Sequence, residues 1–126
     1  MVVDTSALMA VVLDEDTADQ VSARLEGASE IALSTVTMAE ALVVAALRGV
    51  GPEMQRLLDG LGTEVVAVTP ADAVRVADVY SRWGKGAHPA GLNFGDCFSY
   101  ALAQARDCPL LYVGDDFSQT DVRRAS

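Results

Sequence analysis

The sequence has few of the residues on which several kinds of protein chemistry depend. Its 126 residues include 1 histidine and 2 cysteines, and only 9 lysines and arginines against 18 aspartates and glutamates. Cys97 and Cys108 are too few for a disulfide framework and have no second cysteine pair for a zinc site. Because free cysteines are typical of a reducing compartment, we expect a cytoplasmic protein.

Long apolar runs are also missing. The longest, such as 41–47, fall far short of the about 20 residues that a membrane-spanning helix needs. Asp4 interrupts the first hydrophobic run, so we expect neither a signal peptide nor membrane attachment. The composition, 51% hydrophobic and 21% charged, is that of an ordinary globular protein. The length predicts one domain over residues 1–126.

Short apolar segments alternate with segments of helical periodicity. Strands are predicted at 2–4, 31–33, 64–68 and 110–113. Helices are predicted at 7–13, 17–27, 36–48, from Pro52 onward, at 71–83 and at 94–106, with a loop over 84–93. Apolar strands separated by helices predict an α/β fold, in which a short and mostly parallel sheet is flanked by helices on both faces.

Acidic residues gather where such a fold places its functional sites, outside the carboxyl ends of the strands. The candidates are Asp4, Glu40, Asp96, Asp115 and Asp116. Carboxylates brought together repel one another unless protons or cations intervene. A ligand set made of oxygen atoms alone suits Mg²⁺ or Mn²⁺ rather than zinc.

Each carboxylate also has a purely structural explanation. Asp4 can cap the helix that follows it, and Asp96 can stabilise a helix amino terminus. Asp115 and Asp116 can be ordinary turn residues. Glu40 is the most informative, because it interrupts an otherwise apolar run. A buried carboxylate without a partner costs several kcal/mol, so we expect a cation or an arginine beside it.

Three polar residues adjoin these carboxylates. Thr5 or Ser6 can cap the helix after the first strand, or can offer a hydroxyl to a metal or to a phosphate. Asn93 can hydrogen-bond a site carboxylate or cap the helix that begins at Phe94. Both explanations stand for each residue.

The same residues resemble those of the PIN-domain ribonucleases, and more narrowly the VapC toxins of bacterial VapBC toxin–antitoxin pairs. The resemblance runs along the whole chain and rests on residues 2–8, Glu40, 91–101 and 114–117. It implies an Mg²⁺-dependent endoribonuclease that cleaves structured RNA such as tRNA or ribosomal RNA. It also implies a VapB-type antitoxin as partner and a homodimer.

Three acidic residues match those of the family by position: Asp4, Glu40 and Asp96. Many PIN domains have their fourth at the place that Gly114 occupies here, so Asp115 or Asp116 must supply it, and we favour Asp116. The resemblance implies that Asp4 and Asp96 bind Mg²⁺. Glu40 and the Asp115–Asp116 pair would complete the shell, orient water or support a second ion.

The net charge of −9 counts against nucleic-acid binding, because phosphate contacts need cations. Arg82, Lys85 and His88, with Arg75 before them, run from one predicted helix into the loop that precedes Asp96. These cations are either phosphate contacts at the mouth of the site or part of a solvated helix face and a mobile loop.

Other functions remain alternatives to the nuclease. One is a catalytically silent PIN domain that binds protein or RNA. Another is an unrelated phosphohydrolase with Asp4 as nucleophile, although such enzymes usually have a second aspartate where this chain has Ser6. Several apolar residues also exceed what a small core needs, and we expect part of them to form a subunit or antitoxin interface. They are Leu42, Ala46, Leu57, Leu58 and Leu61.

Overall fold

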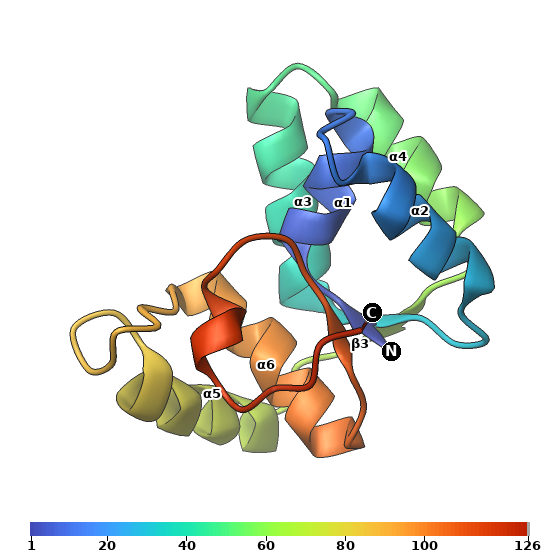
Figure 1. Cartoon of the computed structure of the whole chain (residues 1–126). Coiled ribbons are helices and arrows are strands. Elements are labelled where there is room, and N and C mark those ends of the chain that lie inside the picture. Colours follow the sequence, from blue (N-terminus) through green and yellow to red (C-terminus); the bar gives the residue numbers. More distant parts are fainter. Residues whose placement is uncertain (126) are drawn as a thin grey trace.

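A parallel sheet lies between two layers of helices in the computed structural model, which describes residues 1–125 (Figure 1). Its elements, in chain order, are β1 (Val2–Val3), α1 (Thr5–Val12), α2 (Ala18–Gly27), β2 (Ala32–Ser34), α3 (Thr35–Leu47), α4 (Gly51–Gly60), β3 (Glu64–Val66), α5 (Pro70–Trp83), α6 (Phe94–Arg106), β4 (Leu110–Leu111) and a short 3₁₀ helix, η1 (Phe117–Gln119).

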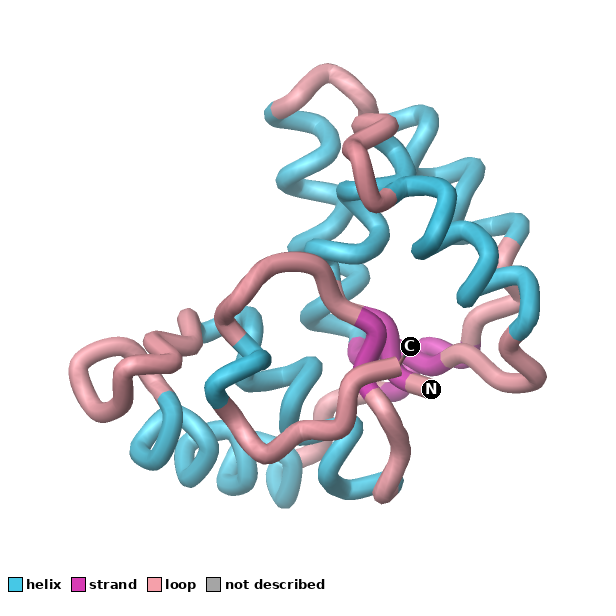
Figure 2. The backbone as a smooth tube through the Cα atoms, in the orientation of Figure 1, coloured by secondary structure: helices cyan, strands magenta, loops and turns pink. Residues whose placement is uncertain are grey.

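The four strands pair in the order β3-β2-β1-β4, and every pairing is parallel. Figure 2 shows the short strands gathered at the centre of the molecule. Val2 pairs with Ala32 on one side and with Leu110 on the other, so β1 is a central strand. Since the strands are parallel, their carboxyl ends meet at one edge of the sheet. The predicted α/β class and the helices on both faces are confirmed.

Successive residues of each central strand face opposite helical layers. Val3 and Leu111 belong to a core formed with α1, α2, α3 and α4. Val2 and Leu110 belong to a second core formed mainly with α5 and α6. Figure 1 shows these two layers on opposite sides of the sheet. Strands buried on both faces explain why the segments read as continuous apolar runs.

The element boundaries differ from the prediction at two informative places. Helix α1 begins at Thr5, because Asp4 is its N-cap and accepts a hydrogen bond from the backbone amide of Ser6. Neither Thr5 nor Ser6 is the cap. Strand β3 ends at Val66, two residues earlier than predicted, and lies at the edge of the sheet, where Val65 is exposed.

The expected surplus of apolar residues on α3 and α4 is mostly core. Leu58 is buried, and the side chains of Leu42, Leu57 and Leu61 pack against the core of that layer. These three side chains are only partly buried and Ala46 is exposed, so the interface predicted for part of this set stays a prediction. The large apolar side chains that this layer does expose are Val43 and Leu47, both on α3. No helix within residues 1–125 has the length and apolar character needed to cross a bilayer.

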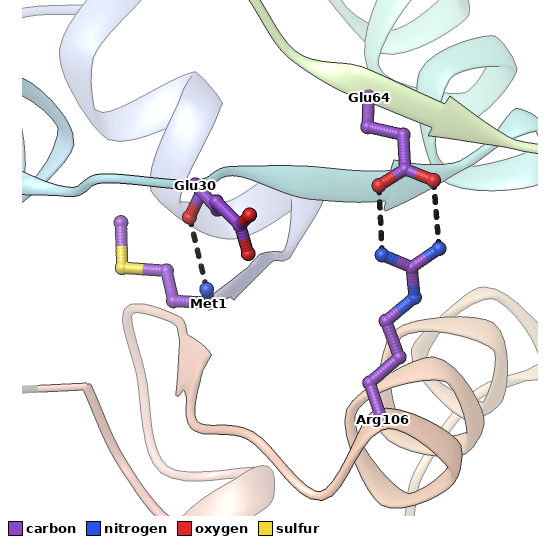
Figure 3. Close-up of polar contacts among 4 residues, drawn as sticks. All are labelled: Met1, Glu30, Glu64 and Arg106. Atoms are coloured by element: carbon purple, nitrogen blue, oxygen red, sulfur yellow. Dashed lines mark hydrogen bonds and ion pairs between the residues drawn. The ribbon is translucent and has the colours of Figure 1, made fainter.

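Two polar contacts close the opposite edge of the sheet, at the amino ends of the strands (Figure 3). The Arg106 guanidinium donates two hydrogen bonds of 2.7 Å to the Glu64 carboxylate, which ties the end of α6 to β3. The amino group of Met1 donates to the carbonyl oxygen of Glu30 at 3.0 Å. These residues line a cavity of about 610 Å³, well separated from the strand ends that carry the acidic residues.

The packing of α3 and α4 predicts a large loss of stability for one large-to-small substitution and almost none for another. Met54→Ala removes a fully buried side chain and is expected to lower the free energy of unfolding by about 2–5 kcal/mol. Leu47→Ala removes a side chain that is 81% exposed and is expected to change it by less than about 0.5 kcal/mol. Urea unfolding of both variants measures the difference, and equal midpoints would contradict this description of the core.

Candidate functional site

Asp4 stands at the carboxyl end of β1 and is held from two sides. Its Oδ2 accepts hydrogen bonds from the amide of Ser6 at 3.0 Å and from the hydroxyl of Ser6 at 2.7 Å. Its Oδ1 accepts from the hydroxyl of Ser99 on α6 at 2.6 Å. Asp4 is therefore a helix cap, as one explanation held, and is also joined to the helix that carries Asp96.

Asp96 lies in the first turn of α6 and is buried. Its Oδ2 accepts from the backbone amide of Asn93 at 3.0 Å, while its own amide donates to Oδ1 of Asn93 at 2.8 Å. This reciprocal capping box satisfies two amides at the helix start. Both explanations offered for Asn93 are thus present, one through its side chain and one through its backbone.

The acidic residues act on one another most clearly at Asp96. Burial raises the pKa of this carboxyl to about 7, against the opposing effect of the Asn93 hydrogen bond. This pKa includes smaller contributions in the same direction from the negative charges of Asp4, Asp116 and Glu40. Of the pair after β4, Asp116 is thus the residue whose charge reaches Asp96. The backbone carbonyl of Asp115 accepts hydrogen bonds from the amide and hydroxyl of Ser118.

Glu40 is half-buried on α3 and has a hydroxyl as its partner. The hydroxyl of Thr5 donates to its Oε1 at 2.6 Å. Its Oε2 lies against Gly95 in the first turn of α6, where a β-carbon would stand 2.2 Å from it. We expected a cation or an arginine beside Glu40. Within residues 1–125 no arginine forms an ion pair with Glu40, and its donor is the neutral hydroxyl of Thr5. The cation stays a prediction.

The candidate phosphate contacts lie on α5 and in the loop that follows it. Arg82 lies 3.9 Å from Asp78 on its own helix, with its guanidinium 5.8 Å from the centre of the Trp83 ring. The ring of His88 meets Trp83 edge to face at 4.7 Å. Figure 1 shows the loop between α5 and α6 projecting outward. In the described part of the chain, no ion pair or hydrogen bond joins Arg82, Lys85 or His88 to the site carboxylates.

The donor chemistry of the site fits Mg²⁺ or Mn²⁺, although the ligands are not gathered in advance. Among residues 1–125, no three histidine, cysteine, aspartate or glutamate side chains form a ready-made metal group. Hard divalent cations prefer carboxylate oxygens. Oδ1 of Asp4, Oδ2 of Asp96 and Oε1 of Glu40 each accept one hydrogen bond and so retain a second lone pair. A cation would also offset the mutual repulsion that raises the pKa of Asp96.

Three residues that contact the acidic group were absent from the sequence-based candidates. Ser99 binds Asp4 directly, Thr37 contacts Ser99, and Gly95 leaves room for Glu40. One signal was available, because Ser99 follows Asp96 by three residues and positions three apart share a helix face. Thr37 gives no comparable signal, since its contact with α6 depends on how the two helices pack.

Comparison with known proteins gives matches over nearly the whole chain. Residues 1–123 match the PIN domain family. Ribonuclease VapC30 of Mycobacterium tuberculosis is 45% identical, over 97% of this chain and 95% of its own. Ribonuclease VapC42 of the same organism is 42% identical, over 99% and 98%. The chain therefore belongs to the PIN domain family, as a homologue of the mycobacterial VapC ribonucleases.

Solved structures agree with this assignment at the level of the fold. The crystal structure of M. tuberculosis VapC20, described as a sarcin–ricin loop cleaving toxin, superposes with a TM-score of 0.79 at 15% identity, covering 96% of this chain and 95% of that one. A toxin–antitoxin complex from Klebsiella pneumoniae gives a TM-score of 0.71 at 19% identity, covering 95% and 92%.

The raised pKa of Asp96 predicts how stability without metal depends on pH. The contribution of the Asp96 carboxyl to folding stability is fully present below its ordinary pKa of 3.8 and is lost as the pH rises through about 7. In EDTA, Asp96→Asn is therefore expected to raise the Tm by several degrees at pH 8 and to leave it nearly unchanged at pH 4. Thermal unfolding at both pH values measures this.

Asp72→Asn is a matched control for which we expect the Tm at pH 8 to change in the opposite direction. Asp72 occupies the same place in the capping box of α5, and hydrogen bonds from Thr69 lower its pKa. Its contribution is present at neutral pH and lost in acid, so this variant is expected to have a lower Tm at pH 8. A lower Tm for both variants at pH 8 would contradict the electrostatic account of Asp96.

Proposed function

We propose that this chain is the toxin of a toxin–antitoxin pair, a metal-dependent endoribonuclease that cleaves structured RNA such as tRNA or ribosomal RNA. The observation that carries the proposal is electrostatic. Asp4, Glu40 and Asp116, from three separate segments, all act on the carboxyl of Asp96. Homology to proteins named as VapC ribonucleases supports the activity, and the description of VapC20 supports a structured ribosomal target.

The acidic residues divide into two roles in this proposal. Asp4 and Asp96 would hold the metal ion, and Glu40 and Asp116 would complete its shell or orient the attacking water. When bound there, Mg²⁺ would lower the pKa of a water and offset charge on the phosphate. The charge of Asp116 on Asp96 supports this residue, rather than Asp115, as the fourth acidic position.

The polar neighbours are assigned mainly to positioning. The Thr5 hydroxyl orients Glu40, the Ser6 hydroxyl orients Asp4, and Asn93 holds the first turn of α6. We assign Arg82, Lys85 and His88 to backbone contacts with RNA away from the cleaved bond. A chain with a net charge of −9 then makes few phosphate contacts and recognises its target largely by shape.

The partner in this proposal is a VapB-type antitoxin that keeps the nuclease inactive in the cytoplasm. A structural neighbour that is itself a toxin–antitoxin complex supports such a partner. Because this chain is acidic, the antitoxin segment that contacts it should be basic. We also propose a homodimer, and the exposed Val43 and Leu47 on α3 offer an apolar surface for one of these contacts.

A cleavage assay tests the activity and the target together. Purified protein, free of antitoxin, is incubated with total cellular RNA in Mg²⁺ or in EDTA, and the cut ends are mapped. We expect discrete cuts in Mg²⁺ or Mn²⁺ that are absent in EDTA. Asp96→Asn is expected to lower the cleavage rate by at least about 100-fold, because a metal ligand is lost.

Asp107→Asn is the control for this substitution. It also neutralises an aspartate at a terminus of α6, but at the carboxyl end, where the residue is the C-cap. Its cleavage rate should equal that of the wild type. If the wild type binds Mg²⁺ and leaves all RNA intact, the catalytically silent PIN domain becomes the correct description.

Gly95 provides a second test that leaves every acidic residue in place. In Gly95→Ala the new β-carbon would stand 2.2 Å from Oε2 of Glu40, so the carboxylate must move away from the hydroxyl of Thr5. We expect normal folding by circular dichroism, since the end of a flexible side chain moves, and cleavage reduced at least about tenfold. Gly60→Ala, with nothing near its would-be β-carbon, should cleave normally.

A further inference from the structure

A line of buried hydroxyl groups runs from the start of α3 to the carboxylate of Asp4. The oxygen atoms of Ser34 and Thr37 are 3.1 Å apart, those of Thr37 and Ser99 are 3.3 Å apart, and Ser99 donates to Asp4 at 2.6 Å. None of the four side chains is more than 4% exposed. The line joins β2, α3 and α6 to the end of β1.

Each hydroxyl in this line can donate its hydrogen bond in only one direction. The carboxylate of Asp4 accepts, so the one proton of the Ser99 hydroxyl is committed to it. Ser99 must then accept from Thr37, and Thr37 must accept from Ser34. The oxygen of Ser34 in turn accepts from the backbone amide of Thr37 at 3.0 Å. Every hydroxyl proton is used, and every bond of the line points toward Asp4.

Ser99 has a distinct place among the groups that hold Asp4. Both contacts of Ser6 reach Oδ2 and come from the residues that directly follow Asp4. Ser99 is the contact to Oδ1, and it reaches across from α6. The same helix carries Asp96 three residues earlier, so α6 presents both a like charge that repels Asp4 and a hydroxyl that retains it.

We propose that Ser99, supported by Thr37 and Ser34, is a positioning residue that holds the Asp4 carboxylate beside Asp96 so that the two can share a metal ion. The metal in this statement rests on the proposed function. Hydrogen bonds from buried partners to a ligand oxygen fix the ligand's rotamer before the metal arrives. Loss of such partners typically weakens metal affinity or activity by 10- to 100-fold.

Metal binding and the position of Asp4 test the proposal without any RNA. Mn²⁺ alone is titrated into the wild type, Ser99→Ala and Thr37→Val, and is followed by electron paramagnetic resonance. We expect Ser99→Ala to raise the Kd for Mn²⁺ at least about tenfold and Thr37→Val to raise it less. Thr37→Ser, which retains the hydroxyl, should restore the wild-type Kd. Crystals of metal-free Ser99→Ala should show Asp4 turned away from Asp96.

Ser81→Ala is the matched control, because the Ser81 hydroxyl donates to a backbone carbonyl within the neighbouring helix α5. It should leave the Kd unchanged. On RNA, Ser99→Ala should lower kcat and leave KM unaltered, since substrate contacts are untouched. Should Ser99→Ala fail to fold, Thr37→Val against Thr37→Ser carries the same comparison.

A purely structural role gives a different result. If Ser99→Ala lowers the Tm in EDTA while the Kd for Mn²⁺ and the rotamer of Asp4 stay as in the wild type, the proposal is overturned. A wild type that binds Mn²⁺ and cuts no RNA refutes the nuclease and leaves this comparison intact. A wild type that binds no Mn²⁺ refutes the metal, and the rotamer of Asp4 then decides the positioning role.

Discussion

Repulsion among carboxylates is the constraint around which this protein is arranged. A parallel sheet brings its strand ends to one edge, and here that edge collects acidic groups from segments far apart in the sequence. Three of them have their own donors: hydroxyls for Asp4 and Glu40, and a backbone amide for Asp96. These donors do not remove the repulsion, which adds to the effect of burial in raising the pKa of Asp96.

Much of the architecture could be predicted, because it follows from local rules. Apolar segments between amphipathic helices indicate a parallel sheet, and the strand-end rule together with the family resemblance singled out Asp4, Glu40 and Asp96. Element ends were predicted less accurately, because Asp4, taken as the last residue of the first strand, is the N-cap of α1. The strand predicted over 64–68 was too long because β3 lies at the sheet edge and ends at Val66.

The residues that support the acidic group, Ser99 and Thr37, could not be predicted from the sequence for a different reason. Thr37 on α3 and Ser99 on α6 are in contact although 62 residues separate them in the sequence. Serine and threonine are also not residue types that indicate burial. The burial of Leu57 and Leu61 likewise depends on which helices pack against them. Sequence periodicity predicts which face of a helix a residue occupies. These contacts depend also on the distance and angle at which two helices pack, and periodicity does not predict either.

The order of β1 in the sheet has a consequence for biosynthesis. β1 pairs with β4 although six helices and two strands lie between them in the sequence, so Val2 can pair with Leu110 only after all of these elements have been synthesised. Asp4 likewise meets Ser99 across 95 residues. A chain that ends before α6 carries Asp4 and Glu40 without Asp96. Such a chain holds most of the core formed by α1 to α4 and lacks most of the core formed by α5 and α6. The acidic group is thus assembled only after α6, β4 and the turn that follows β4 have been synthesised.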